Sequence, residues 1–172
     1  KSIIIITMTT KIINNHNKLT KLAILYCAGL GSGFSKKAPG TVGTIAAMLL
    51  AAIFLQLEIY LNLFYLLFSL FILASGAVSI NYLFKKGAIS EKDPQFIVID
   101  EWAGYFLAFS ISKISYEGLL ISFFLFRIFD ILKPFGIKEV EKLDQGLGIM
   151  LDDYLAGFYA GLVSLFIMNY LF

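Results

Sequence analysis

Long apolar segments alternate with short polar connections along most of this chain. The apolar segments cover residues 41–57, 61–84, 96–112, 118–132 and 154–172. Each is close to the ~20 residues that an α-helix needs to cross a bilayer. The pattern predicts an all-α fold, an integral membrane helical bundle with about four to five membrane-embedded helices. The third and fourth segments are short and carry charges near one end, so shallow insertion or a four-span topology is also compatible.

The composition supports a membrane protein. Of the 172 residues, 59% are hydrophobic and only 15% are charged, and the mean hydropathy is +0.82. These values lie outside the usual range of soluble domains. We expect a polar, flexible amino-terminal segment at residues 1–21 and a single helical membrane domain at residues 22–172. Met8 is a possible natural start of the chain.

Lysines are concentrated in alternate connections, which predicts the orientation of the bundle. The opposite connections carry only Glu58, Lys113 and Glu117. Eleven of the other lysines fall in the amino-terminal segment, the second connection and the fourth connection: Lys11, Lys18, Lys21, Lys36, Lys37, Lys85, Lys86, Lys92, Lys133, Lys138 and Lys142. The positive-inside rule therefore places these three regions in the cytoplasm. The net charge is only +2 and the lysines form no single stripe, which favours anionic membrane lipid over nucleic acid as a partner.

Five carboxylates lie at the predicted cytoplasmic ends of the apolar segments. Asp100 and Glu101 open the third segment, Asp130 closes the fourth, and Asp152 and Asp153 precede the fifth. An ionised carboxylate costs roughly 2.5–3.5 kcal/mol at the centre of a membrane helix and less near the interface. Such a cluster indicates nearby cations, water or a polar substrate. Helix capping would explain Asp100 or Glu101 alone, and the two side chains point about 100° apart on a helix.

The string FRIFDILKPF combines both signs of charge. Arg127, Asp130 and Lys133 recur every three residues, which predicts two cations around one carboxylate on one helical face. A structural salt bridge would account for Arg127 with Asp130, but it would leave Lys133 and the neighbouring acids unexplained. Arginine and lysine beside carboxylates that can hold Mg²⁺ suit a phosphate ester.

The string GLGIMLDDYLAG places two acids after a pair of glycines. We expect Asp152 and Asp153 at the amino end of a helix, where the helix dipole favours carboxylates. Capping alone would explain one of them, and metal binding would explain both. Further along, Gly157 and Gly161 have the G-x-x-x-G spacing that predicts close helix packing.

A glycine-rich stretch, GLGSGFSKKAPGTVG, precedes the first long apolar segment. Its glycines permit close backbone approach, and Thr41 is placed to cap a helix whose amino end attracts anions. The spacing fits neither a P-loop nor a dinucleotide-binding loop. The stretch is therefore either a hinge or a phosphate site.

Common phosphatase nucleophiles are missing from suitable positions. Cys27 has Gly33 rather than arginine six positions later, so a cysteine phosphatase loop is absent. It is also the only cysteine, which excludes an intramolecular disulfide and a cysteine metal cluster. The only histidine, His16, lies in the polar amino-terminal segment. Metal-activated water remains as the expected chemistry.

Four ordered motifs, GFSKKAPGTVGT, IVIDEWAG, FRIFDILKP and GLGIMLDDYLAG, resemble the phosphatidylglycerophosphatase A family of bacterial inner-membrane enzymes. The motifs span residues 33–157. The resemblance implies hydrolysis of phosphatidylglycerophosphate to phosphatidylglycerol and phosphate, with Mg²⁺ required. Lys36 and Lys37 depart from the small residues often found before Ala-Pro-Gly-Thr, which we expect to alter affinity rather than chemistry.

Matched motif by motif, the resemblance assigns the site. It implies an acidic, metal-binding set of Asp100, Glu101, Asp130, Asp152 and Asp153. It also implies that the phosphate lies near Arg127, Lys133, Lys37, Gly40 and Thr41.

The resulting hypothesis is a metal-dependent hydrolysis. One or two Mg²⁺ ions held by Asp100, Asp130 and Asp152 or Asp153 orient the phosphate and activate water. Arg127 and Lys133 stabilise the developing charge. An aspartyl-phosphate intermediate is an alternative. Rival functions are a CDP-alcohol phosphotransferase, whose D-x-x-D-G-x-x-A-R pattern is missing, and a small ion carrier, whose charges would line a path across the membrane.

Overall fold

The computed structural model describes residues 17–91, 94–134, 136–140 and 145–170, and these contain helices and no strand. In chain order the elements are α2 (Lys18–Cys27), the 3₁₀ segment η1 (Gly29–Phe34), α3 (Pro39–Gln56), α4 (Asn62–Lys85), α5 (Ile99–Ile111), α6 (Tyr116–Leu132), the short α7 (Ile137–Val140) and α8 (Gln145–Tyr170). The predicted amino-terminal segment overlaps α2 at residues 18–21. The interpretations of Met8 and His16 lie outside the described residues.

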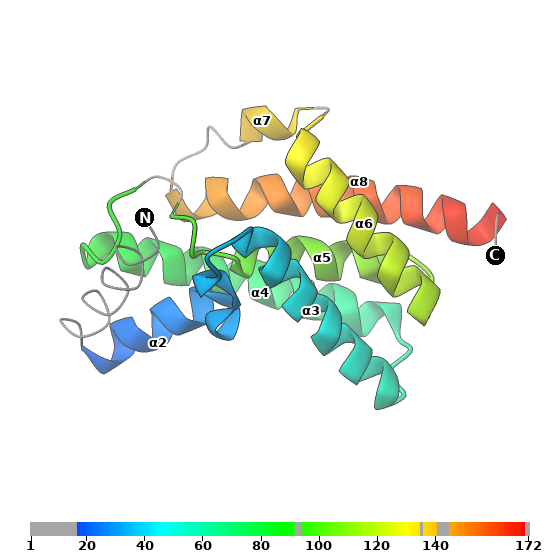
Figure 1. Cartoon of the computed structure of the whole chain (residues 1–172), viewed down its shortest axis with the longest axis horizontal. Helices are drawn as coiled ribbons and strands as arrows, with labels where there is room; N and C mark the ends of the chain where they lie inside the picture. Colours follow the sequence, from blue (N-terminus) through cyan, green and yellow to red (C-terminus); the bar gives the residue numbers. More distant parts are fainter. Residues whose placement is uncertain (1–16, 92–93, 135, 141–144, 171–172) are drawn as a thin grey trace.

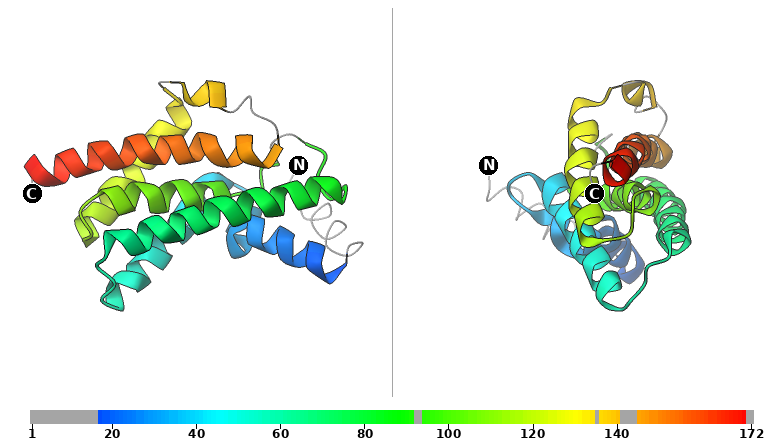
Figure 2. Two further views of the ribbon diagram at one scale, coloured as in Figure 1. Left: turned by 180° about the vertical axis from the view of Figure 1, so that it is seen from behind. Right: turned by 90° about the vertical axis from the view of Figure 1, so that its right-hand side faces the viewer.

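Helix α5 is the centre of the bundle. It lies between α4 and α8, and α3 and α6 cross it on another side (Figures 1 and 2). Every residue of α5 except Glu101 and Ile111 is buried. A helix that is apolar nearly all round is buried by its neighbours. This explains why α5, with only 13 residues, need not reach across a bilayer on its own.

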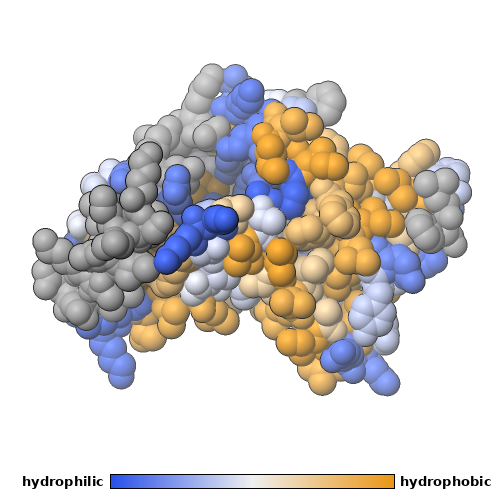
Figure 3. Space-filling model, viewed as in Figure 1, coloured by the Kyte–Doolittle hydropathy of each residue, from blue (hydrophilic) through white to orange (hydrophobic). Residues whose placement is uncertain are grey.

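The long helices carry the apolar outer surface. By length and composition, α3, α4 and residues 146–170 of α8 are able to cross a membrane, whereas α6 has 17 residues. Large exposed side chains such as Leu49, Phe71, Phe124 and Phe166 lie on α3, α4, α6 and α8. Figure 3 shows the corresponding apolar area over the half of the molecule that contains α3 and α6. The prediction of an all-α membrane bundle is confirmed.

Two helix starts differ from the sequence prediction. Thr41 is not the cap of the first long helix, because α3 already begins at Pro39, with Ala38 before it at a φ of 46°. Proline suits the first helical position since its fixed φ matches the helix and it needs no N–H partner there. Asp152 and Asp153 are not at a helix end, because α8 begins at Gln145 and they lie about two turns inside it. Helix capping therefore explains neither acid.

The end of α5 opposite the acidic residues is closed by polar side chains. The Asn62 amide donates to the carbonyls of Ser110 and Ser112 at 2.7 and 2.9 Å, which satisfies groups that a helix end leaves unpaired. Nearby, the hydroxyl of Ser164 on α8 lies 2.7 Å from that of Ser112 and 3.2 Å from that of Ser122. These bonds join α4, α5, α6 and α8 within an otherwise apolar core.

The G-x-x-x-G spacing brings α8 against α5, as predicted. A Cβ atom added at Gly157 would lie 2.2 Å from the carbonyl oxygen of Gly104. The reverse holds too, since a Cβ at Gly104 would lie 2.4 Å from the carbonyl oxygen of Asp153. The backbones of the two helices are therefore in direct contact at this crossing. The contact also fixes the position of Asp153 along α5, close to the acids at the start of that helix.

Substituting Gly157→Ala should therefore lower the free energy of unfolding in detergent by about 1–3 kcal/mol, the usual cost of overpacking. The higher helix propensity of alanine offsets this by no more than ~1 kcal/mol. Gly161→Ala is the matched comparison, because its nearest neighbours are the Ile111 side chain at 2.8 Å and the Ala108 carbonyl oxygen at 3.0 Å. We expect a smaller loss there, measured by denaturant unfolding followed by circular dichroism. Equal losses would contradict the tight crossing at Gly157.

Candidate active site

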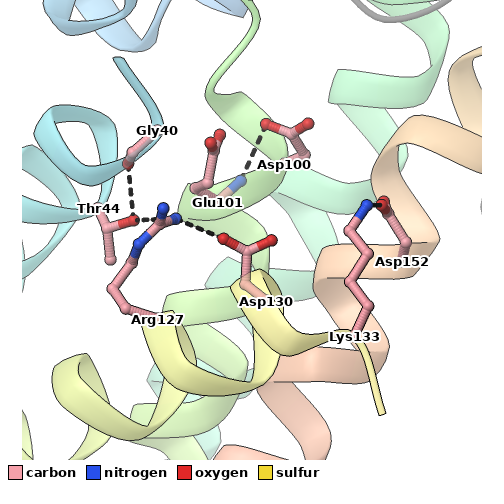
Figure 4. Close-up of polar contacts among 8 residues, drawn as sticks. All are labelled: Gly40, Thr44, Asp100, Glu101, Arg127, Asp130, Lys133 and Asp152. Atoms are coloured by element: carbon pink, nitrogen blue, oxygen red, sulfur yellow. Dashed lines mark hydrogen bonds and ion pairs between the residues drawn. The ribbon is translucent and has the colours of Figure 1, made fainter. Parts of the chain in front are cut away.

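Four helices meet where the charged residues gather. The amino ends of α3 and α5, the carboxyl end of α6 and the first half of α8 come together around Asp100, Glu101, Asp130 and Asp152 (Figure 4). These residues come from α5, α6 and α8, which are far apart in sequence. The structure thus collects into one region the acids that sequence analysis placed at one end of the bundle.

Three of the acids form a tight cluster. One carboxylate oxygen each from Asp100, Glu101 and Asp153 lies within 4.8 Å of the other two. Asp100 and Asp153 are only 7% and 5% exposed. The ~100° between adjacent helical positions does not keep Asp100 and Glu101 apart, because each contributes one carboxylate oxygen to the cluster with Asp153 of α8. The sequence left open whether Asp152 or Asp153 would bind a metal together with Asp100. In the structure, Asp153 belongs to this cluster.

The cluster has the donor set of a hard cation. Oxygen Oδ1 of Asp100 accepts the backbone N–H of Glu101 at 3.0 Å, which holds that carboxylate against the first turn of α5. Oxygen Oε2 of Glu101 is buried and has no hydrogen-bond partner. A buried, unpaired carboxylate oxygen is costly unless a cation satisfies it. Carboxylate oxygens are the ligands that Mg²⁺ and Ca²⁺ prefer, so the residues present fit such a metal.

Arg127 is bound on two sides. Its Nη1 forms an ion pair with Oδ2 of Asp130 at 2.6 Å, as the spacing in sequence predicted, and donates a long hydrogen bond of 3.5 Å to Oγ1 of Thr44 on α3. The Thr44 hydroxyl in turn donates to the Gly40 carbonyl at 2.9 Å. The Arg127 Nε is buried without a partner. The Nε–H group is therefore a donor that remains available for a bound anion.

Lys133 reaches a different acid from the one expected. Helix α6 ends at Leu132, and Lys133 adopts a left-handed conformation with φ of 44°. This turn directs its side chain to α8, where Nζ lies 2.7 Å from Oδ2 of Asp152. The prediction that both cations surround Asp130 on one helical face is correct for Arg127 and wrong for Lys133, because α6 ends before Lys133. The two cations are instead shared between Asp130 and Asp152.

The glycine-rich segment contributes Gly40 rather than its first glycines. A Cβ atom at Gly40 would lie 2.3 Å from Oε1 of Glu101 and 3.4 Å from Nη1 of Arg127. By contrast, a Cβ at Gly33 would meet the backbone of Phe96 at 2.1 Å, so that glycine serves packing. Lys37 is exposed and Thr41 is half-buried, and among the described contacts none joins either side chain to the acids.

Sequence analysis missed Thr44. This residue is fully buried and connects the start of α3 to Arg127. The available signal was its position four residues after Gly40, on the same face of the helix. A threonine in an apolar segment otherwise resembles an ordinary packing residue.

Cys27 lies close to the site without serving as a nucleophile. It is completely buried at the end of α2. Burial, and to a lesser degree the charge of Asp100, raises the pKa of the Cys27 thiol to about 12. The thiolate is the reactive form of cysteine, so this side chain is inert near neutral pH.

Comparison with known proteins identifies relatives over most of the chain. A Haemophilus influenzae protein named Phosphatidylglycerophosphatase A is 39% identical, with 86% of this chain and 93% of the relative covered. A Bacteroides thetaiotaomicron protein named "Putative phosphatidylinositol-3-phosphatase" is 37% identical, with 81% and 89% covered. An Escherichia coli protein named Phosphatidylglycerophosphatase A is 31% identical, with 83% and 81% covered.

No solved structure matches the chain. The family model described as Phosphatidylglycerophosphatase A matches residues 25–168, which include all of the acidic and basic residues of the site. This chain therefore belongs to the phosphatidylglycerophosphatase A family of phosphatase enzymes.

Proposed function

We propose that this enzyme hydrolyses phosphatidylglycerophosphate to phosphatidylglycerol and inorganic phosphate in glycerophospholipid biosynthesis, with Mg²⁺ as its cofactor. The observation that carries the proposal is the pairing of unsatisfied groups of opposite sign. Oxygen Oε2 of Glu101 and Nε of Arg127 are both buried without a hydrogen-bond partner. A metal-bound phosphate ester would give each of them a partner. The names of two relatives support the choice of lipid.

Asp100, Glu101 and Asp153 would hold Mg²⁺, and Asp130 and Asp152 complete the acidic set beside them. Bound there, Mg²⁺ would supply charge neutralisation at the phosphate oxygens and would lower the pKa of an attacking water, so that a carboxylate could take its proton. Asp130 and Asp152 keep Arg127 and Lys133 in place through their ion pairs.

The cations act on the phosphate itself. Arg127 and Lys133 bind its oxygens and stabilise the charge that develops as water forms a bond to phosphorus and the glycerol oxygen leaves. Asp100 and Asp130 are the carboxylates placed to take the proton of the water. Direct attack by one of these two carboxylates, with an aspartyl-phosphate intermediate, is the alternative route. The connection with Lys37, Gly40 and Thr41 would bind the substrate beside them.

We further propose that the protein is a multi-pass protein of the bacterial inner membrane, with residues 22–172 as one domain and its site facing the cytoplasm. The lysine-rich connections support this orientation through the positive-inside rule. The same lysines would attract anionic membrane lipid. In this orientation the acyl chains of the substrate stay in the bilayer while its phosphate reaches the acids.

Gly40 tests whether the start of α3 forms part of the site. We expect Gly40→Ala to lower kcat/KM by roughly 10–100-fold, the loss typical when a metal ligand loses its support, because the new Cβ displaces the Glu101 carboxylate. Gly31→Ala is the control, since a Cβ there meets no atom within 4 Å, although its φ of 103° adds local strain. Both variants should insert and remain helical by circular dichroism. Normal activity in Gly40→Ala would remove this residue from the site.

The decisive experiment measures phosphate release by the purified protein in detergent. Phosphatidylglycerophosphate, phosphatidylinositol 3-phosphate and phosphatidic acid are compared, each with Mg²⁺ and with chelator. We expect Mg²⁺-dependent release that is fastest from phosphatidylglycerophosphate. Faster release from phosphatidylinositol 3-phosphate would instead favour the substrate that the name of the second relative carries. No release from any lipid by folded protein would reject the phosphatase and favour ion transport or CDP-alcohol transfer.

A further inference from the structure

Helix α2 has an apolar face that the bundle leaves open. Leu19, Leu22 and Leu25 are 61%, 53% and 43% exposed. Their three-residue spacing puts them on one side of the helix. With 10 residues, α2 is too short to cross a bilayer. The exposed leucines therefore need an explanation other than a membrane span.

The face of α2 opposite the leucines is buried in the bundle through Thr20, Ile24 and Cys27, and two hydroxyl contacts fix the helix to α4. The Tyr26 hydroxyl lies 2.5 Å from that of Ser75, and the Thr20 hydroxyl lies 3.2 Å from that of Tyr82. Since these two contacts run in opposite order along the two helices, α2 is antiparallel to the last turns of α4. The leucine face thus has a fixed direction, pointing away from the bundle.

Two lysines border the apolar face. A hollow of about 240 Å³ lies along α2 and is lined by Lys18, Lys21, Leu22, Ile24, Leu25 and Phe34. Its walls are almost entirely apolar, and the side chains of the two lysines form part of them. A partner that fits it has a hydrocarbon part and a negatively charged part. An anionic phospholipid has both.

The location of α2 agrees with such a partner. Its carboxyl end leads through η1 directly to α3, whose first turn holds Gly40 at the site. The helix lies at the same end of the bundle as the amino end of α8 and the carboxyl end of α4 (Figure 1). A short helix with leucines on one face and lysines beside them is typical of helices that lie in the membrane interface.

We propose that α2 is an interfacial helix that binds anionic phospholipid in the leaflet on which the acidic site opens. Leu19, Leu22 and Leu25 enter the acyl region, and Lys18 and Lys21 bind the headgroup phosphate. The inference rests on the membrane placement proposed above and is independent of the reaction. It gives the enzyme a lipid contact separate from the acidic site.

A nitroxide label on Leu22→Cys tests the proposal in vesicles of phosphatidylcholine with and without phosphatidylglycerol. Cys27 is buried, so the introduced cysteine takes the label. Phe71→Cys on α4 is the lipid-facing reference and the exposed Ser90→Cys is the aqueous one. We expect the Leu22 label to collide with oxygen more often, and with a water-soluble nickel chelate less often, than the Ser90 label. Phosphatidylglycerol should slow its motion.

The double variant Lys18→Gln/Lys21→Gln should lose the response to phosphatidylglycerol while the label stays in the interface. Collision with the nickel chelate equal to that of the Ser90 label would overturn the proposal. Protection from both reagents would also overturn it, because protein rather than lipid would then cover the leucines. Phosphate release measured in the same vesicles reports on the proposed reaction separately, whatever the label shows.

Discussion

Asp153→Asn should abolish most of the activity while making the metal-free protein more stable. The carboxylate is one of three buried acids whose oxygens lie within 4.8 Å of one another. The substitution removes a proposed metal ligand, and a bound metal contributes several kcal/mol of transition-state stabilisation. A loss of that size lowers kcat/KM by at least about 100-fold. Because three like charges repel one another in a buried site, the asparagine should raise the Tm measured in chelator.

Mg²⁺ should stabilise wild type and leave the stability of Asp153→Asn nearly unchanged. Wild type should gain stability with the metal, by about 2.7 kcal/mol at a concentration 100 times the Kd, whereas Asp153→Asn should gain little. The single tryptophan, Trp102, is buried directly after Glu101, so its fluorescence offers a direct titration of the site. Glu117→Gln, at the far end of α6, is the matched control. If Asp153→Asn responded to Mg²⁺ as wild type does, the metal assignment would be wrong.

Arg127→Lys should lose roughly 100-fold or more in kcat although the positive charge is kept. The Nη1 of Arg127 already contacts Asp130 and Thr44, and Nε remains for a phosphate oxygen. A lysine has one nitrogen and cannot meet these demands together. Keeping a cation beside Asp130 avoids the penalty of an unpaired buried carboxylate, so folding should be preserved.

Phosphate release at saturating lipid measures this effect, with Lys138→Gln on the exposed face of α7 as the control for charge alone. We expect less than a twofold change in the control, since long-range effects of an exposed charge are screened. Activity of Arg127→Lys close to that of wild type would show that Arg127 serves only as a structural partner of Asp130.

The fold class and the grouping of the acids could be predicted from the sequence. Apolar segments report directly on burial in lipid or protein, whereas the orientation inferred from the lysines stays a prediction. The string containing Arg127 and Asp130 predicted their ion pair because both residues lie within one continuous helix. Likewise, the spacing of Gly157 and Gly161 predicted close packing of this helix, although only the structure shows that its partner is α5.

Features that depend on where a helix ends could not be predicted in this way. Lys133 follows the last residue of α6, so a single left-handed residue redirects its side chain to Asp152. Glycines at 146 and 148 suggested a turn, yet α8 continues through both, because Gly146 packs against the Ala77 carbonyl of α4. Tertiary contacts determine both the direction of Lys133 and the start of α8. The role of Thr44 also depends on a tertiary contact, the one with Arg127, so the sequence did not predict it.

The close crossing of α5 and α8 also has a consequence for how the enzyme is made. Helix α5 carries Asp100 and Glu101, but Asp153 arrives on the helix that is synthesised last among those described. During translation the first two acids emerge long before the third carboxylate and before Arg127. The acidic cluster is therefore incomplete until α8 has packed against Gly104, so we expect an unfinished chain to be inactive.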